Sequence, residues 1–155
     1  MPGRIDVFRI PTRISFGRGV ALTVADPLRQ VGATKVLLVT DPGVRKVGLT
    51  VPIEERLRDA KIPFEVYDEV VPDPGVAEVQ RCYERAKECG ADAFVAVGGG
   101  SSIDTAKMAA VLLTNGGTVL DYIGMSARRG MSAARECSIF SGKRGSPTSS
   151  TGSSS

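Results

Sequence analysis

The chain has 155 residues, enough for one domain with a hydrophobic core of its own. Hydrophobic residues make up 42% of it, and a net charge of +3 is too small to indicate a nucleic-acid partner, so the composition predicts a soluble globular protein. We see neither an export signal nor a membrane span, and we expect a cytoplasmic protein without a membrane partner. The sequence contains no histidine, the commonest metal ligand and general base, and its three cysteines form no metal-binding or redox pattern.

The first 31 residues predict two short strands and an interrupted helix. Residues 7–10 and 13–16 alternate apolar and polar side chains, as short strands or a hairpin do. Residues 20–31 favour a helix, but Pro27 interrupts them. Either Asp26 caps a new helix that has the proline in its first turn, or a single helix is kinked there.

A buried strand is predicted at residues 35–40, with Asp41 at its carboxyl end. Open parallel sheets bind ligands at the carboxyl ends of their strands, so this carboxylate is a candidate ligand contact. It could accept hydrogen bonds from both ribose hydroxyls of an adenosine and would repel a 2′-phosphate, which favours NAD over NADP. Alternatively, Asp41 only begins the turn formed with Pro42 and Gly43, and the spacing alone does not decide between the two interpretations.

The middle of the chain alternates helices and strands. Residues 50–52 open a helix whose predicted apolar stripe is Ile53, Leu57 and Ala60, and whose charged residues Glu54, Glu55, Arg56, Arg58 and Asp59 are expected to face solvent. Residues 64–67 predict a strand. A second helix, ended by Gly90, has the predicted stripe Val76, Val79, Tyr83 and Ala86, and we expect Cys82 and Cys89 to serve packing rather than chemistry.

The most informative segment joins an apolar strand at residues 93–97 to a helix through Gly98, Gly99 and Gly100. Three glycines give up backbone entropy, and they let a bulky ligand approach the main chain closely. We expect Ser101 or Ser102 to cap the helix, and the free N–H groups at its start to bind an anion such as a diphosphate. The alternative is a plain tight turn. The usual dinucleotide fingerprint is incomplete, because Ile103 stands where its third glycine belongs.

Strands and helices in this order predict an α/β fold, a doubly wound parallel sheet of the Rossmann-like kind, over residues 1–124. The apolar face of the last helix is expected to be Ile103, Ala106, Ala110 and Leu113. Residues 125–155 are rich in Ser, Gly and Arg, so they predict a disordered tail that contains no strand before Pro147.

Residues 98–107, with the sequence Gly-Gly-Gly-Ser-Ser-Ile-Asp-Thr-Ala-Lys, resemble the signature of the iron-containing (group III) alcohol dehydrogenase family, which includes glycerol dehydrogenases. Residues 11–17 are similar to the family's opening, and the resemblance extends from about Phe8 to Gly124. It implies an oxidoreductase that passes a hydride between NAD, or NADP, and a small alcohol or aldehyde. It also implies cofactor-binding roles for Asp41, Gly98, Gly99, Gly100, Ser101, Ser102 and Asp104.

Within these roles, the resemblance assigns the diphosphate to the glycines and serines, the adenosine ribose to Asp41 and the nicotinamide-side ribose to Asp104. An acid in the first helical turn also stabilises a helix by about 0.3–1 kcal/mol without any ligand, so Asp104 has a structural alternative. For Lys107, which can pair with Asp104, we expect a structural role.

The family also binds Fe²⁺ or Zn²⁺ through an Asp and three His of a helical carboxyl-terminal domain, and this sequence offers no such ligands and no catalytic residue. We interpret the chain as the cofactor half of such an enzyme, produced by a natural truncation, a frameshift or a boundary chosen for expression. Its exposed apolar surface would then favour association, for example as a homo-oligomer. A non-catalytic nucleotide-binding fragment and a dehydroquinate synthase-like lyase are the alternatives, and the substrate is not specified.

Overall fold

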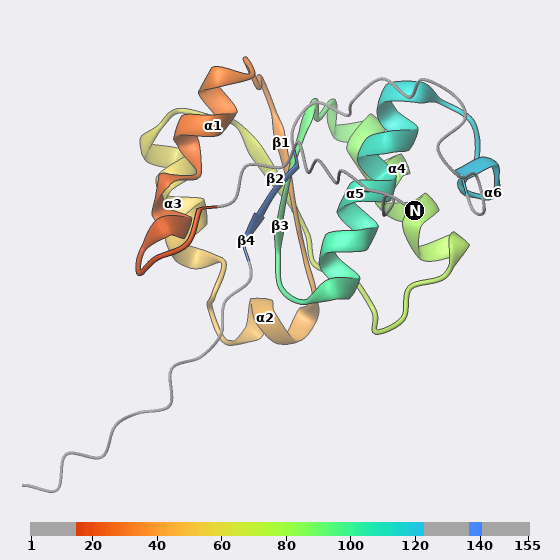
Figure 1. Ribbon diagram of the computed structural model, residues 1–155, viewed down its shortest axis with the longest axis horizontal. Coiled ribbons are helices and arrows are strands. Elements are labelled where there is room, and N and C mark those ends of the chain that lie inside the picture. The colour runs from red at the N-terminus through yellow and green to blue at the C-terminus, as the bar shows by residue number, and fades with distance from the viewer. Residues whose placement is uncertain (1–14, 123–136, 141–155) are drawn as a thin grey trace, which may run out of the picture.

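The computed structural model describes residues 15–122 and 137–140. Within them, a four-stranded parallel sheet is covered by helices on both faces, which confirms the predicted doubly wound α/β fold (Figure 1). The strand predicted at residues 7–10 lies outside the described residues. Residues 15–16, the described part of the next predicted strand, belong to no strand.

The described elements follow one another through short connections. They are η1 (Val20–Thr23), α1 (Ala25–Gln30), β1 (Val36–Thr40), α2 (Pro42–Lys46), α3 (Val51–Asp59), β2 (Phe64–Tyr67), α4 (Val76–Cys89), β3 (Ala93–Val97), α5 (Gly100–Asn115), α6 (Val119–Tyr122) and β4 (Cys137–Phe140).

The strand order is β2-β1-β3-β4, and every neighbouring pair is parallel. The chain leaves β1 toward β2 on one side and leaves β3 toward β4 on the other. The connections of these two central neighbours therefore diverge, which makes the space above their carboxyl ends the topological switch point of the sheet. Figure 1 shows α2 and the turn that enters α5 together at this end of the molecule.

Alternation along the central strands divides the core into two layers. Leu37 and Val39 of β1 face α4 and α5, whereas Val36 and Leu38 face the side covered by α1 and α3. All five residues of β1 and all five of β3 are buried, as the unbroken apolar runs predicted. Each fully buried Leu or Val contributes about 1.5–3 kcal/mol, so these layers hold the carboxyl ends of β1 and β3 in a stable position.

Three predictions about individual elements were wrong. The interrupted segment forms the 3-10 helix η1 followed by a new helix, α1, which has Pro27 in its first turn as expected, but the N-cap is Val24 and not Asp26. Val76 is 40% exposed instead of joining the apolar stripe of α4. Glu54 is only 5% exposed, because Arg45 and Arg58 pair with its two carboxylate oxygens and compensate its burial.

The segment expected to contain no strand also contains one, because β4 pairs with β3 from Phe94 opposite Cys137 to Val97 opposite Phe140. Residues 137–140 form a strand because their backbone pairs with the edge of β3, although their composition did not predict one. The other residues of the predicted tail lie outside the described part of the chain.

Candidate cofactor site

The candidate site lies at the switch point, where Asp41 follows β1 and Gly98 follows β3. Thr40 and Val97, the last residues of the two strands, are paired in register, so the residues that follow them are neighbours. The buried Thr40 hydroxyl donates a hydrogen bond of 2.7 Å to the Val97 carbonyl. This bond joins the two strand ends directly below the site and limits their separation.

Asp41 is both a helix cap and a group that faces the glycine turn. Its Oδ1 accepts a hydrogen bond of 2.9 Å from the Val44 N–H and caps α2, in which Pro42 occupies the first position. Its Oδ2 lies 3.2 Å from the position that a Cβ on Gly98 would take. The capping role predicted as the alternative is therefore present, but it uses one oxygen and leaves Oδ2 directed toward the switch point.

The three glycines have different reasons to be glycine. Gly98 has a φ of +147°, which side chains rarely tolerate, and an added Cβ would lie 2.7 Å from the Ser102 Oγ. Gly99 and Gly100 are exposed, and a Cβ at either position would meet nothing within 4 Å. Gly98 is thus required by its own surroundings, whereas Gly99 and Gly100 leave main chain open to an approaching molecule.

The amino end of α5 is uncapped. Gly99 is the N-cap and no side chain bonds to the first-turn N–H groups, so the prediction that Ser101 or Ser102 caps this helix was wrong. Both serines lie within the first turn, after the glycine at which the helix begins. Because the first N–H groups of a helix have no intrahelical acceptor, these donors and the helix dipole make the start of α5 a candidate anion site beside Asp41.

Two buried hydroxyls near this helix start, those of Ser102 and Thr105, have no hydrogen-bond partner among the described residues. Each of the two residues is 1% exposed. A buried hydroxyl without a partner costs about 1–3 kcal/mol, so both side chains are candidates to hydrogen-bond a polar ligand. Ser102 was predicted as a site residue. Thr105 was missed, although it lies three residues further along the same motif and hence on the same helix face.

An apolar cavity of about 270 Å³ continues from this end of α5. It is lined by Pro74, Gly75, Val76, Val79, Asp104, Thr105, Met108 and Val119. Asp104 is exposed at its rim and the hydroxyl side chain of Thr105 belongs to its wall. No ion pair joins Asp104 to Lys107 in the part of the chain that the structure describes. The structure thus places Asp41, Gly98 and Ser102 together and sets Asp104 one turn further along, beside this cavity.

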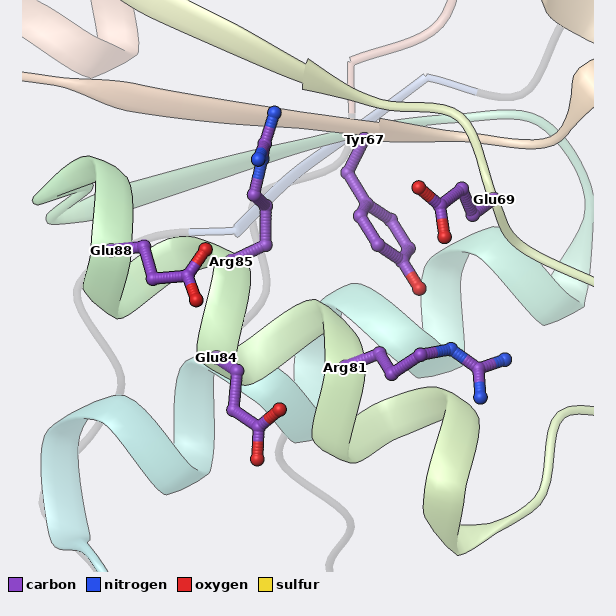
Figure 2. A pocket seen from close by; sticks show the side chains of 6 residues that line it. All are labelled: Tyr67, Glu69, Arg81, Glu84, Arg85 and Glu88. Carbon is purple, nitrogen blue, oxygen red and sulfur yellow. The ribbon is translucent and has the colours of Figure 1, made fainter.

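A second cavity, of about 190 Å³, contains none of the predicted site residues (Figure 2). It lies between the end of β2 and α4 and is lined by Tyr67, Glu69, Arg81, Glu84, Arg85 and Glu88. Burial raises the pKa of the Tyr67 hydroxyl, and the nearby Arg81 side chain partly offsets this shift (Figure 2). The charged residues around this ring are mostly exposed, so the cavity is a polar surface hollow.

The described residues do not fit a metal site. Residues 15–122 and 137–140 contain no group of three or more His, Cys, Asp or Glu side chains able to hold an ion, and the sequence has no histidine. Within the same residues, no helix has both the length and the apolar character needed to cross a bilayer.

The fold is that of doubly wound α/β proteins, which bind ligands at such switch points. The profile of the family described as iron-containing alcohol dehydrogenase matches residues 11–151. The chain therefore belongs to the iron-containing alcohol dehydrogenase family. This confirms the family inferred from the segment at residues 98–107.

Individual relatives agree with this membership. A choline dehydrogenase of Bacillus subtilis (strain 168) is 41% identical over 119 residues, which are 77% of this chain and 30% of that protein. The crystal structure of a 1,3-propanediol oxidoreductase superposes with a TM-score of 0.81 at 28% identity, over 89% of this chain and 36% of the other. The sulfoacetaldehyde reductase of Bifidobacterium kashiwanohense, solved in complex with NAD⁺, superposes with a TM-score of 0.71 at 28% identity, over 90% and 36%. The chain spans about a third of the length of these relatives.

Proposed function

We propose that this chain binds NAD at the switch point and supplies the cofactor half of an alcohol dehydrogenase. The observation that carries the proposal is that three features meet at the switch point. They are the start of the sixteen-residue helix α5, which has no side-chain cap, the exposed main chain of Gly99 and Gly100, and Asp41 Oδ2, which has no hydrogen-bond partner among the described residues. A diphosphate needs the first two features, and an adenosine ribose needs the third.

The diphosphate would lie against Gly99 and Gly100, where a Cβ would meet nothing within 4 Å, and would accept hydrogen bonds from the first N–H groups of α5. The unpartnered Ser102 hydroxyl lies at the base of this turn and would donate to the same group or to its hydration water. Because these main-chain donors are already in place at the switch point, the diphosphate would bind with little reorganisation of the protein.

The two ends of the dinucleotide would lie on opposite sides of this anchor. Asp41 Oδ2 would accept from the adenosine ribose hydroxyls and oppose a 2′-phosphate, which favours NAD over NADP. On the other side, the cavity of about 270 Å³ would receive the nicotinamide ribose, with Asp104 at its rim and Thr105 in its wall. When bound, NAD supplies the hydride acceptor, and the residues named here hold and orient it.

For the complete protein, relatives named choline dehydrogenase and 1,3-propanediol oxidoreductase support a small alcohol or aldehyde as substrate. The family name supports a bound metal, whose ligands would come from outside the described residues. We further propose that the protein acts in the cytoplasm.

Titration of the purified chain with NADH, followed by nicotinamide fluorescence, tests the proposal directly. We expect saturable binding that ADP displaces, because ADP carries the ribose and diphosphate groups that the switch point would recognise. Absence of binding at about 1 mM NADH, where an association free energy of about 4 kcal/mol would be detected, would reject it. NAD-dependent oxidation of glycerol, 1,2-propanediol and short alcohols with added Fe²⁺ or Zn²⁺ then tests whether this chain also turns over substrate.

A further inference from the structure

Helix α2 is held by the packing of Val44 against the core and by one polar tether, the guanidinium of Arg45. Its Nη1 donates to the Thr50 hydroxyl at 2.8 Å and pairs with Oε1 of Glu54 at the start of α3. Its Nε lies 3.9 Å from Asp68 Oδ2, in the residue that follows β2. A single side chain of α2 therefore contacts both the start of α3 and the residue that follows β2.

The central acceptor of this cluster is itself well fixed. The Glu54 side chain is 6% exposed, and its second oxygen receives Arg58 Nη2 at 3.1 Å. A buried carboxylate with two cationic partners has little freedom to move, because leaving either partner would expose an unpaired charge to the protein interior. Arg45 is consequently tied to a rigid point of α3.

Movement of α2 would move the proposed ribose acceptor. The helix has five residues, too few to be stable without tertiary contacts. Its N-cap is Asp41, whose Oδ1 is bound to the Val44 N–H, and the Arg45 N–H donates to the Asp41 carbonyl at 3.0 Å. The direction in which Oδ2 points therefore depends on where α2 lies.

We propose that Arg45 is a positioning residue that, through α2, aims the Asp41 carboxylate at the adenosine ribose and so selects NAD over NADP. Its charge is shared between Glu54 and Asp68, so it is not available to neutralise a 2′-phosphate. This inference rests on the proposed function, since it needs the ribose to lie at Asp41. Releasing the tether lets the carboxylate turn away, which removes both its attraction for the ribose hydroxyls and its repulsion of a phosphate.

The test compares Arg45→Met with Arg58→Met in the full chain. Each variant removes one ion pair from Glu54, but only the first releases α2. We expect Arg45→Met to contract the ratio of NADPH to NADH dissociation constants by about tenfold, the effect of losing one charge-assisted hydrogen bond. Arg58→Met should leave this ratio at its original value, although it loses a comparable ion pair. An unchanged ratio in Arg45→Met, or an equal contraction in both variants, would overturn the inference.

A double-mutant cycle with Asp41→Asn shows whether Arg45 acts through that carboxylate. In the Asp41→Asn background, Arg45→Met should cause no further change in the ratio, and a further change of full size would overturn the inference. Circular dichroism establishes that each variant is folded. If Arg45→Met does not fold, Arg45→Lys replaces it, because a single ammonium keeps the charge but loses the planar fork that reaches three partners. A chain that binds no NADH rejects the proposed function instead, while NADH binding that responds to Asp41→Asn but not to Arg45 rejects this inference alone.

Discussion

Two aspartates lie at opposite ends of the same pair of strands and differ in how far the protein uses their oxygens. Asp92, before β3, accepts hydrogen bonds from the Thr34 N–H, the Thr34 hydroxyl and the Lys35 N–H at 2.8–3.0 Å, with both of its oxygens engaged. Asp41, after β1, makes one hydrogen bond among the described residues, through Oδ1 to Val44. At the amino edge of the sheet, both carboxylate oxygens of Asp92 accept hydrogen bonds, whereas at the carboxyl edge Asp41 Oδ2 accepts none from the described residues.

The same contrast applies to the main chain around them. At the amino edge, Asp92 joins the starts of β1 and β3, and its own N–H donates to the Lys35 carbonyl at 2.9 Å. At the carboxyl edge, α5 begins on Gly99 without a side-chain cap. Native proteins satisfy nearly all buried polar groups, so the Ser102 and Thr105 hydroxyls, which have no partner among the described residues, support the proposal that the carboxyl edge binds a ligand.

The largest effect is expected for Gly98→Ala at the carboxyl edge. Its φ of +147° and the 2.7 Å approach to Ser102 Oγ should lower the free energy of unfolding by about 2–4 kcal/mol and abolish NADH binding. Urea unfolding and NADH fluorescence measure the two quantities. Gly99→Ala is the control, because its Cβ meets nothing within 4 Å, and it should weaken NADH binding while changing stability by no more than about 0.5 kcal/mol. Equal stability losses in the two variants would contradict this division of roles.

At the amino edge, Asp92→Ala should affect stability but not binding. Losing hydrogen bonds to a carboxylate at a partly exposed site should lower the free energy of unfolding by about 1–2 kcal/mol. The NADH dissociation constant should not change, because the substitution lies at the far end of the strands. A marked loss of NADH affinity in a folded Asp92→Ala protein would show that the two edges are not independent.

Acid should remove the Asp92 contribution. Burial raises the pKa of Asp92, but hydrogen bonds from the Lys35 and Thr34 N–H groups and the Thr34 hydroxyl outweigh it and hold this pKa below its ordinary value. The contribution is therefore complete above the unfolded pKa of about 3.9 and is lost as the pH falls through the lower folded pKa. Urea unfolding at a series of pH values should show the difference between the original chain and Asp92→Ala narrowing below about pH 4, and a constant difference would disagree.

Asp41→Asn should separate capping from charge at the carboxyl edge. Asparagine caps helices as well as aspartate does, so the free energy of unfolding should stay within about 0.5 kcal/mol. Loss of the carboxylate should weaken NADH binding about tenfold and improve tolerance of NADPH. Asp41→Ala, which also removes the cap of α2, should show the same change in cofactor preference together with reduced stability. Unchanged cofactor preference in both variants would remove Asp41 from the site.

The smallest effect is expected for Ser102→Ala. Because the hydroxyl is buried without a partner, removing it should leave stability unchanged or raise it by up to about 1 kcal/mol. NADH binding should weaken about threefold to tenfold, the value of one hydrogen bond to a ligand. Thermal unfolding without cofactor and fluorescence titration with NADH provide the two measurements. A loss of stability with intact binding would mean that the hydroxyl has a structural partner.

Several elements could be predicted from the sequence to the residue. Strands β2 and β3 have the predicted bounds, and α4 ends before Gly90, whose φ of +70° closes the helix. The prediction of β3 succeeded because burial on two faces demands an unbroken apolar run, and that of β2 because its residues alternate apolar and polar with high strand propensity. The end of α4 was predicted because glycine readily adopts a left-handed C-cap. The core roles expected for Ala106 and Ala110 were also confirmed, because both belong to the apolar stripe with which α5 packs into the core.

Two short elements, α2 and β4, were not predicted. Helix α2 and strand β4 have five and four residues, and elements of this length depend on contacts from elsewhere in the chain. The burial of Glu54 was missed because its charge predicts exposure unless the arginine from α2 is known to reach it. In the candidate site, Thr105 and the cavity beside Pro74 were missed, since residues 74 and 105 meet only after α4 and α5 pack together.

By itself, the sequence determined the family, the α/β class and the segment from Gly98 to Ser102 as the candidate anchor, because glycine and hydroxyl residues have strong local preferences. Only the tertiary structure decided that Asp41 faces Gly98, that one of its oxygens caps α2 and that the other makes no hydrogen bond with any residue the structure describes. Strand order and register are set by long-range packing, so the proximity of residues 41 and 98 could not be predicted from the sequence around either one.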